Sequence, residues 1–275
     1  MEHNNARTPL ISIGMPLYNA AGTVRFAFDS LLAQTLPDFE LIVSDNASTD
    51  ATADICEDYQ RRDPRVRYVR QPTNLGAAAN FEYVLNAARG EFFMWAASDD
   101  IWQPQFLERN VAALRANSRC VASVSRVRME IPPSKDERFV GTSPLRGTFE
   151  EKLRAFLAEP GQNSRFYGLF RREQIKAAFV PEPFIAGDWA IMINLLRAGD
   201  FHEVPEVLME RASDGASSRL HAAGGIFPRL KGVWVLRDFT AWLWNNLEPS
   251  EFRRCILHIA WLNLRFSYAQ IFRGR

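Results

Sequence analysis

Strand and helix signals alternate along the first half of the sequence, and this alternation constrains the fold more than any other feature. Short apolar runs that read as buried strands occupy residues 10–15, 39–43, 66–69 and 92–97. Between them, apolar residues recur at helical spacing after Pro16, over about 49–60 and over about 76–88. Alternation with short turns predicts parallel strands joined by right-handed crossovers. We therefore expect an α/β fold with a mostly parallel sheet flanked by helices.

The second half carries weaker signals. We expect helices over 149–157 and 188–197 and an extended segment over 201–210. Residues 131–147 contain three prolines and mixed charges, which predicts a loop or a boundary between subdomains. From residue 226 onward the pattern is helical and amphipathic.

The net charge of +1 argues against bulk nucleic-acid binding, but the charge is unevenly distributed. Residues 226–275 hold eight Lys or Arg against three Asp or Glu, and they contain four of the seven tryptophans. This composition predicts either a pair of interfacial helices on an anionic membrane or a helical cap that packs on the rest of the chain or forms a homodimer.

Three scattered cysteines without metal-type spacing indicate reduced thiols, and the polar residues 1–5 lack the apolar core of a signal peptide. No apolar run is long enough to span a membrane. We expect a cytoplasmic protein, either free or peripheral on the inner face of the cell membrane.

Two adjacent carboxylates, Asp99 and Asp100, follow the strand expected at 92–97. Burial of unpaired carboxylates is costly, and a hard divalent cation that takes oxygen ligands would offset the cost. Consecutive side chains near a strand end point in different directions, so one carboxylate would hold the metal while its neighbour faces a ligand. The alternative is a helix N-cap, because Pro104 and an amphipathic stretch follow closely.

In parallel sheets, ligands bind beyond the carboxyl ends of the strands. The segments that follow the four expected strands, and that should line one rim, are 16–19, 45–48, 71–76 and 98–100. Asp45 is suited to accept the imide N–H of uracil or thymine, with Tyr18 as a stacking surface beside it. Helix capping is the alternative for this segment, and Asn19 is equally suited to cap the next helix.

Asn74 and Gly76 lie where a strand passes into a helix. Glycine there permits close approach of a ligand or an unusual backbone angle, and an ordinary turn is equally compatible. The sequence has neither a P-loop motif nor a G-x-G-x-x-G motif, which disfavours a P-loop kinase and a dinucleotide oxidoreductase.

Gly187 and Asp188 open a strongly apolar helix. Asp188 is either a general base that faces a cleft or an acid that caps the first turn. Trp189 beside it is a candidate apolar wall for a sugar ring. Arg211 begins a polar segment that either folds over a diphosphate or forms a surface loop. His221 is either a further metal ligand or an exposed histidine.

Several of these segments, in this order, resemble the family 2 glycosyltransferases, which have the Rossmann-like GT-A fold. The match covers residues 10 to about 117 and rests on MPLYN at 15–19, DNASTD at 45–50, NLGAAAN at 74–80 and SDD at 98–100. Gly187–Trp189 is a looser match to the Glu-Asp catalytic pair of the family, with glycine in place of the first acid. Residues 213–218 stand where the family has a His-Gly-Ser-type segment.

The resemblance implies a set of roles. Pro16, Tyr18 and Asp45 would hold the nucleotide base, and Asp99 would lie near the ribose or the sugar. Asp100 would bind the Mg²⁺ or Mn²⁺ that bridges the diphosphate and neutralises it as a leaving group. Asp188 would be the catalytic base. The remaining residues that we predict at the donor site are Asn19, Asn74, Gly76 and Arg211.

The predicted activity is inverting transfer from a nucleotide diphosphate sugar, with UDP- and dTDP-sugars favoured, to a hydroxyl of a saccharide or lipid-linked saccharide. Bacterial surface-polysaccharide synthesis fits such an acceptor. The alternatives are a sugar-1-phosphate nucleotidyltransferase and a non-catalytic nucleotide-binding protein. We divide the chain into a GT-A catalytic domain at 1–225, with a nucleotide-binding half at 8–117 and an acceptor-binding half at 118–225, and a helical extension at 226–275.

Overall fold

The computed structural model describes residues 8–129, 141–161, 163–212 and 236–273, with side chains described as far as residue 266. The strands are β1 (Ile11–Leu17), β2 (Phe39–Asp45), β3 (Val66–Arg70), β4 (Phe92–Trp95), β5 (Ile101–Trp102), β6 (Cys120–Met129), β7 (Leu169–Arg171) and β8 (Asp200–Arg211). The helices are α1 (Val24–Leu32), α2 (Thr52–Arg62), α3 (Ala77–Asn86), α4 (Phe106–Ala116), α5 (Phe149–Ala158), α6 (Arg172–Ala178), α7 (Gly187–Ala198), α9 (Arg237–Asn246) and α10 (Pro249–Arg273), with a 3₁₀ helix η2 (Ser164–Tyr167).

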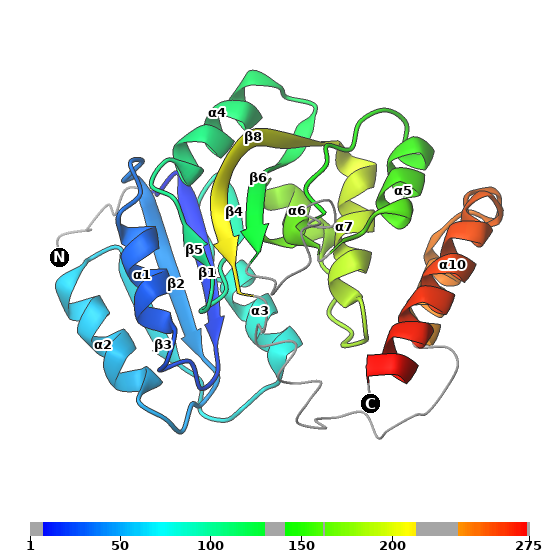
Figure 1. Ribbon diagram of the computed structural model, residues 1–275. Helices are drawn as coiled ribbons and strands as arrows, with labels where there is room; N and C mark the ends of the chain where they lie inside the picture. Colours follow the sequence, from blue (N-terminus) through cyan, green and yellow to red (C-terminus); the bar gives the residue numbers. More distant parts are fainter. Residues whose placement is uncertain (1–7, 130–140, 162, 213–235, 274–275) are drawn as a thin grey trace.

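The predicted mostly parallel sheet with flanking helices is confirmed. The strands described form one sheet in the order β3-β2-β1-β4-β7-β6-β8-β5. The first four strands of the chain pair only in parallel with one another, whereas β7 is antiparallel to both of its neighbours, β4 and β6. Helices cover both faces of this sheet (Figure 1). The carboxyl ends of β1, β2 and β4 therefore meet at one edge.

Both faces of the central strands are buried, as expected for a parallel sheet covered by helices. In β2, Leu41 and Val43 belong to one apolar cluster, and Ile42 between them belongs to the other. All seven residues of β2 are buried. This burial explains why Leu41, Ile42 and Val43 form an uninterrupted apolar run instead of alternating with polar residues.

Two details differ from the sequence-based prediction. The first strand does not stop at Pro16 but continues to Leu17. Beyond Gly14, β1 pairs with β2 and no longer with β4, and proline is tolerated in such a one-sided stretch. The second difference is a group of elements that were not predicted: β5, β6, β7 and α6.

The C-terminal helices pack against the second half of the sheet domain. Cys255, Ile259 and Leu262 of α10 are buried in the same apolar cluster as α5 and α7. Arg197 of α7 also pairs with Glu251 of α10 at 2.8 Å. Figure 1 shows α10 beside α5, at the end of the molecule away from β1–β3. The expected helical C-terminal part is confirmed, and one of its faces belongs to the core.

Candidate active site

The loops that follow β1 and β2 lie side by side, because the two strands pair in parallel with Leu17 opposite Asp45. Tyr18 comes next after β1, and its side chain is 49% exposed. Asn19 has a left-handed backbone (φ 50°), and its Oδ1 accepts the backbone N–H of Thr49 at 2.8 Å. The side chain of Asn19 ties the two loops together instead of capping α1. An exposed aromatic ring therefore lies next to Asp45 at the carboxyl edge of the sheet.

Asp45 is fully buried and already holds protein donors. Its Oδ1 accepts the N–H of Ser48 at 2.9 Å, and its Oδ2 accepts the hydroxyl of Tyr68 at 3.0 Å. The Nε of Arg70 lies 3.8 Å from the same Oδ2. Burial raises the pKa of Tyr68, and the hydrogen bond to Asp45 raises it further, so the phenol keeps its proton. Each carboxylate oxygen has a second lone pair, and the contact of Asp45 with a base stays a prediction.

The loop after β3 is joined to the loop after β2 by side-chain amides. Asn46 donates through Nδ2 to Asn74 Oδ1 at 2.8 Å and accepts the N–H of Leu75 at 2.8 Å. Asn74 Oδ1 also accepts the N–H of Gly76 at 2.9 Å. Gly76 has φ 83°, and a Cβ added there would meet nothing within 4 Å. The backbone angle, and not crowding, therefore explains this glycine.

Asp100 is buried at the point where the chain leaves β4, with 3% of its surface exposed. Its Oδ2 lies 3.5 Å from Nε of Arg211, and its Oδ1 accepts the backbone N–H of Ala212 at 3.3 Å. Burial raises the pKa of Asp100 to about 7, and Arg211 acts in the opposite direction. Helix α4 begins only at Phe106, so neither Asp99 nor Asp100 caps it.

The surroundings of Asp100 fit a divalent cation that is shared with a ligand. Its Oδ2 is buried and makes no hydrogen bond with any described residue. Within the described part of the chain, no group of three or more His, Cys, Asp or Glu side chains could hold a metal by itself. Mg²⁺ commonly takes one or two carboxylates and completes its shell with substrate phosphates and water. A cation at Asp100 would therefore need a phosphate ligand.

Arg211, the last residue of β8, connects Asp100 to η2. Its guanidinium carbon lies 4.6 Å from the centre of the Tyr167 ring, and its Nη1 donates to Ser164 Oγ at 3.0 Å. Arg211 therefore lies beside Asp100, and its contact with a diphosphate stays a prediction. The residues that follow it along the chain, including Asp214 and His221, lie outside the described residues.

Asp188 is the second residue of α7. Its Oδ2 accepts a hydrogen bond from Nδ2 of Asn163 at 2.7 Å. Burial raises the pKa of Asp188 above its usual value, and the hydrogen bonds from Asn163 and from the backbone N–H of Trp189 act against this rise. A carboxylate with a raised pKa is better matched to proton transfer near neutral pH.

The charges of Asp99, Asp100 and Asp188 all act on Tyr167, and we call these three residues the carboxylate cluster. Burial raises the pKa of Tyr167, the cluster adds to the rise, and Arg211 opposes it. The two aspartates after β4 and the aspartate that opens α7 therefore act on one phenol, although they lie almost 90 residues apart in the sequence. The three carboxylates therefore share one electrostatic environment, and their roles in catalysis and donor binding stay predictions.

Trp189 has a different environment from the one expected. It is 6% exposed, and its ring packs edge-on against Phe156, Phe239 and Phe266 at 6.3, 5.6 and 5.4 Å between centroids. This ring joins α7 to α5, α9 and α10. The structure leaves the predicted sugar wall no exposed ring face, because Trp189 forms part of the core.

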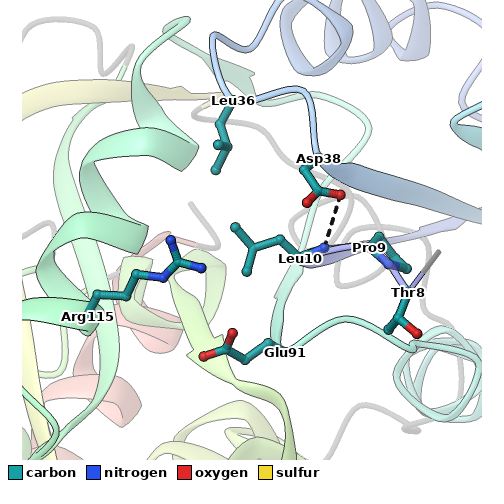
Figure 2. Close-up of a pocket in the computed structure, with 7 residues that line it drawn as sticks. All are labelled: Thr8, Pro9, Leu10, Leu36, Asp38, Glu91 and Arg115. Carbon is teal, nitrogen blue, oxygen red and sulfur yellow. Dashed lines mark hydrogen bonds between the residues drawn. The ribbon is translucent and has the colours of Figure 1, made fainter.

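A shallow hollow of about 530 Å³ lies elsewhere, at the amino end of β1. Its lining residues are Thr8, Pro9, Leu10, Leu36, Asp38, Glu91 and Arg115. Figure 2 shows the side chains of Arg115 and Glu91 pointing toward this hollow, and the N–H of Leu10 bonded to Asp38. It lies at the edge of the sheet opposite the carboxylate cluster, where parallel sheets do not bind their ligands.

Sequence reasoning did not identify Asn163, Ser164 and Tyr167. They lie in and just before η2, which packs between β4, β6 and α7. A four-residue 3₁₀ helix has no periodic signal, and its contact with Asp188 spans 25 residues. An asparagine shortly after a glycine was the only local hint.

A comparison with protein families covers the part of the site that holds Asp45, Asp99 and Asp100, but not Asp188 or Arg211. The family model described as "Glycosyl transferase family 2" matches residues 12–179, more than half of the chain. The chain belongs to glycosyl transferase family 2. This family 2 chain is similar to TuaG of Bacillus subtilis (strain 168), a glycosyltransferase named for teichuronic acid biosynthesis. The two are 34% identical over 110 residues, and this alignment covers 40% of the chain and 44% of TuaG. The chain is 32% identical over 213 residues to the uncharacterized protein Rv1520 of Mycobacterium tuberculosis, covering 75% of the chain and 58% of that relative. The chain thus spans about half the length of these relatives.

Solved structures confirm the GT-A fold for this family 2 member. Staphylococcus aureus TarS 1–349 in complex with UDP-GlcNAc superposes with a TM-score of 0.70 at 20% identity, over 95% of this chain and 74% of TarS 1–349. The mannosyltransferase PcManGT from Pyrobaculum calidifontis, in complex with GDP-Man and Mn²⁺, gives a TM-score of 0.63 at 19% identity. This superposition covers 96% of this chain and 74% of PcManGT. Among the described residues, no helix is both long and apolar enough to cross a membrane.

Proposed function

We propose that this family 2 member transfers a sugar, with inversion, from a nucleotide diphosphate sugar to a hydroxyl of a saccharide or lipid-linked saccharide. The observation that carries this proposal is that Asp100 and Asp188 both act on Tyr167 and Arg211, with Asp100 in an ion pair with Arg211. One carboxylate is suited to the diphosphate side and the other to the acceptor side. The membership of glycosyl transferase family 2 supports the reaction class.

In the proposed reaction, Asp188 removes the proton from the acceptor hydroxyl as that oxygen forms a bond to the anomeric carbon. The bond from this carbon to the diphosphate oxygen breaks, and the nucleoside diphosphate leaves with the electron pair. Attack from the face opposite the leaving group inverts the anomeric centre. The raised pKa of Asp188, caused by burial, suits a base that must accept a proton near neutral pH.

The donor site extends from Tyr18 to Asp100 along the carboxyl edge of the sheet. We assign the base to Tyr18, Asp45 and Pro16, with Asn19, Asn74 and Gly76 holding the loops that surround it. Asp99 lies toward the ribose or sugar, and Arg211 lies toward the diphosphate. We favour a UDP- or dTDP-sugar, and the likeness to TarS, solved with UDP-GlcNAc, supports a uridine donor.

Asp100 would hold Mg²⁺ or Mn²⁺, which would supply charge neutralisation at the diphosphate. The chain's own part is to hold Asp100 in a buried site, between the guanidinium of Arg211 and the backbone N–H of Ala212. PcManGT, solved with Mn²⁺, is a structural neighbour that supports a metal in this fold.

We place the reaction in bacterial surface-polysaccharide synthesis, which the name of TuaG supports. The catalytic domain is then 1–225, with 8–117 as the nucleotide-binding half and 118–225 as the acceptor-binding half. Residues 226–275 form the extension. The proposed location is the cytoplasm or the inner face of the membrane.

Product analysis tests the reaction class. The protein is incubated with Mn²⁺, with UDP-, dTDP- or GDP-sugars, and with a panel of saccharide and lipid-linked acceptors. Acceptor-dependent release of nucleoside diphosphate, with an inverted anomeric configuration by NMR, is the expected result. Release of pyrophosphate from a nucleoside triphosphate and a sugar 1-phosphate would favour the nucleotidyltransferase. A rise in melting temperature with donor but no release under any condition would favour a binding protein.

The outer face of α10 supports the membrane location. Apolar side chains recur there at helical spacing and are exposed: Ile256 is 50%, Leu257 79%, Trp261 46% and Leu264 68% exposed. The inner face of the same helix is also apolar and is buried in the core. A helix that is apolar on both sides needs a partner for each side.

Charge favours an anionic bilayer as that second partner. Arg253 and Arg265 are exposed on α10, and the guanidinium of Arg265 lies 5.1 Å from the Trp261 ring centre. Basic residues near an anionic bilayer contribute about 1 kcal/mol each, and tryptophan favours the interface. A homodimer through this face would bring like charges together.

Co-sedimentation with vesicles distinguishes the two candidate partners of the outer face of α10, an anionic bilayer and a second copy of the chain. The intact protein should sediment with phosphatidylglycerol vesicles at low salt and not with phosphatidylcholine vesicles. The variant Leu257→Glu/Leu264→Glu should lose this binding, whereas the matched control Phe26→Glu, at a 66% exposed aromatic on α1, should keep it. Loss of a dimer by light scattering in the double variant, with no vesicle binding by the intact protein, would identify a homodimer interface instead.

A further inference from the structure

We propose that Asn163 is a positioning residue for the reaction, and that its side-chain amide holds the carboxylate of Asp188 in the orientation from which it removes the acceptor proton. This inference rests on the proposed function of Asp188. The Nδ2 of Asn163 donates to Asp188 Oδ2 at 2.7 Å, a short distance typical of a bond to a charged acceptor. Asn163 is 2% exposed, so solvent does not compete for this amide.

The backbone at Asn163 separates a side-chain role from a purely conformational one. Asn163 has φ 49° and ψ 44°, the left-handed conformation, and asparagine tolerates it better than most residues. Its N–H donates to Pro160 O at 3.1 Å, and its carbonyl accepts the N–H of Phe166 at 2.9 Å. Glycine would meet this backbone requirement at least as well. An asparagine therefore adds what glycine lacks, which is the amide that contacts Asp188.

The groups around Asp188 show why its carboxylate needs this donor. The charge of Arg211 of β8 lowers the pKa of Asp188, and Asp188 raises the pKa of Tyr167 of η2 together with Asp99 and Asp100. Burial favours the protonated form of Asp188, and a protonated carboxyl cannot serve as a base. The amide of Asn163 and the backbone N–H of Trp189 oppose this effect. Among the described residues, Asn163 is the side chain that donates a hydrogen bond to Asp188.

The amide oxygen of Asn163 points to a second contribution. It is buried and makes no hydrogen bond with the described residues. Because Nδ2 is committed to Asp188, this oxygen is left to accept from a water or from a hydroxyl of a bound saccharide. The same side chain would thus contact the base on one side and a polar ligand on the other.

The test compares pH–rate profiles of variants that differ in the side chain but not in the backbone requirement. Asn163→Gly keeps the left-handed backbone and removes the amide. We expect the acidic side of the pH profile of kcat/KM (the acid limb) to shift to higher pH by about one unit, because one hydrogen bond to a charged group is lost. Activity should recover at still higher pH. Asn163→Asp should move the limb further, since two carboxylates in contact share a proton.

Asn194→Ala is the matched control. Asn194 lies on α7, the helix that carries Asp188, and its side chain donates to Ala178 O at 3.2 Å instead of to Asp188. The melting temperature of this variant should fall while its acid limb stays in place. A pH-independent loss in Asn163→Gly that follows its melting temperature would overturn the inference, and so would an unchanged profile. If Asp188→Asn itself retains turnover, the proposed base is wrong. If that variant is inactive and the limb of Asn163→Gly does not move, only the role of Asn163 fails.

Discussion

Replacement of Asp188 by asparagine removes the proposed base with very little change in shape. Oδ1 of the new amide can still accept a hydrogen bond from Asn163, as the carboxylate oxygen does now at 2.7 Å. The amide cannot accept a proton at neutral pH. Loss of a general base lowers the rate about 10²–10⁴-fold, which corresponds to about 3–5 kcal/mol of transition-state stabilisation.

The effect of the same change on stability should be much smaller. The negative charge in the first turn of α7 contributes about 0.3–1 kcal/mol through the helix dipole. Burial of the carboxylate, which raises its pKa, acts in the other direction, because the neutral amide is easier to desolvate. The two effects largely cancel, and the net change should stay below about 1 kcal/mol, or a few degrees in melting temperature.

The assay measures turnover, donor affinity and melting temperature on the same preparation. Turnover comes from acceptor-dependent nucleotide release, and affinity comes from calorimetry with a nucleoside diphosphate and Mn²⁺. We expect a large loss of kcat with donor affinity nearly unchanged. Near-normal turnover would refute the assignment and direct attention to Asp214. A loss explained by weaker donor binding or by a lower melting temperature would leave Asp188 as a helix-terminal acid.

Two further predictions concern other carboxylates. Asp100→Ala should abolish the gain in nucleoside diphosphate affinity that Mn²⁺ provides, and calorimetry with and without the metal checks this; a large remaining gain would contradict the metal assignment. In β2, burial acts to raise the pKa of Glu40, but hydrogen bonds from Arg89 and Ser12 outweigh it and hold the pKa below its usual value. A depressed pKa stabilises the fold above the unfolded value and loses this contribution as pH falls through the folded value. Glu40→Gln should therefore cost about 1–3 kcal/mol at pH 7, and the difference from the native protein should shrink below pH 4.5 in urea titrations; a difference independent of pH would contradict this account.

The strand-end argument identified much of the candidate site because it depends on topology alone. A parallel sheet of β1 to β4 brings Tyr18, Asp45 and Asp100 to one edge, and this placement does not depend on how side chains pack in the rest of the chain. Each of these strands has four or more residues and is rich in apolar or β-branched side chains, so it can be read from the sequence. The pairing of Leu17 with Asp45 then follows from the parallel register.

The remaining elements could not be read in this way. β5 has two residues and β7 has three, which is too short for any period to appear. The first six residues of β6 are buried on both faces, so polar and apolar positions do not alternate in burial there. Trp189 shows the same limit for a side chain, because its burial depends on Phe239 and Phe266 from helices 50 or more residues away.

The charge of the site constrains how an anionic donor can bind. When ionised, the carboxylate cluster contributes three negative charges, and Arg211 is the cation that contacts it among the described residues. A diphosphate placed beside Asp100 would add further negative charge to a buried region, where repulsion is weakly screened. Protonation of Asp100, whose pKa burial raises to about 7, relieves part of this repulsion. It also removes the oxygen ligand, so it cannot hold the diphosphate in place. A divalent cation relieves the repulsion and keeps Asp100 as a ligand. Removal of the metal should therefore weaken donor binding strongly, while the stability of the fold should change little.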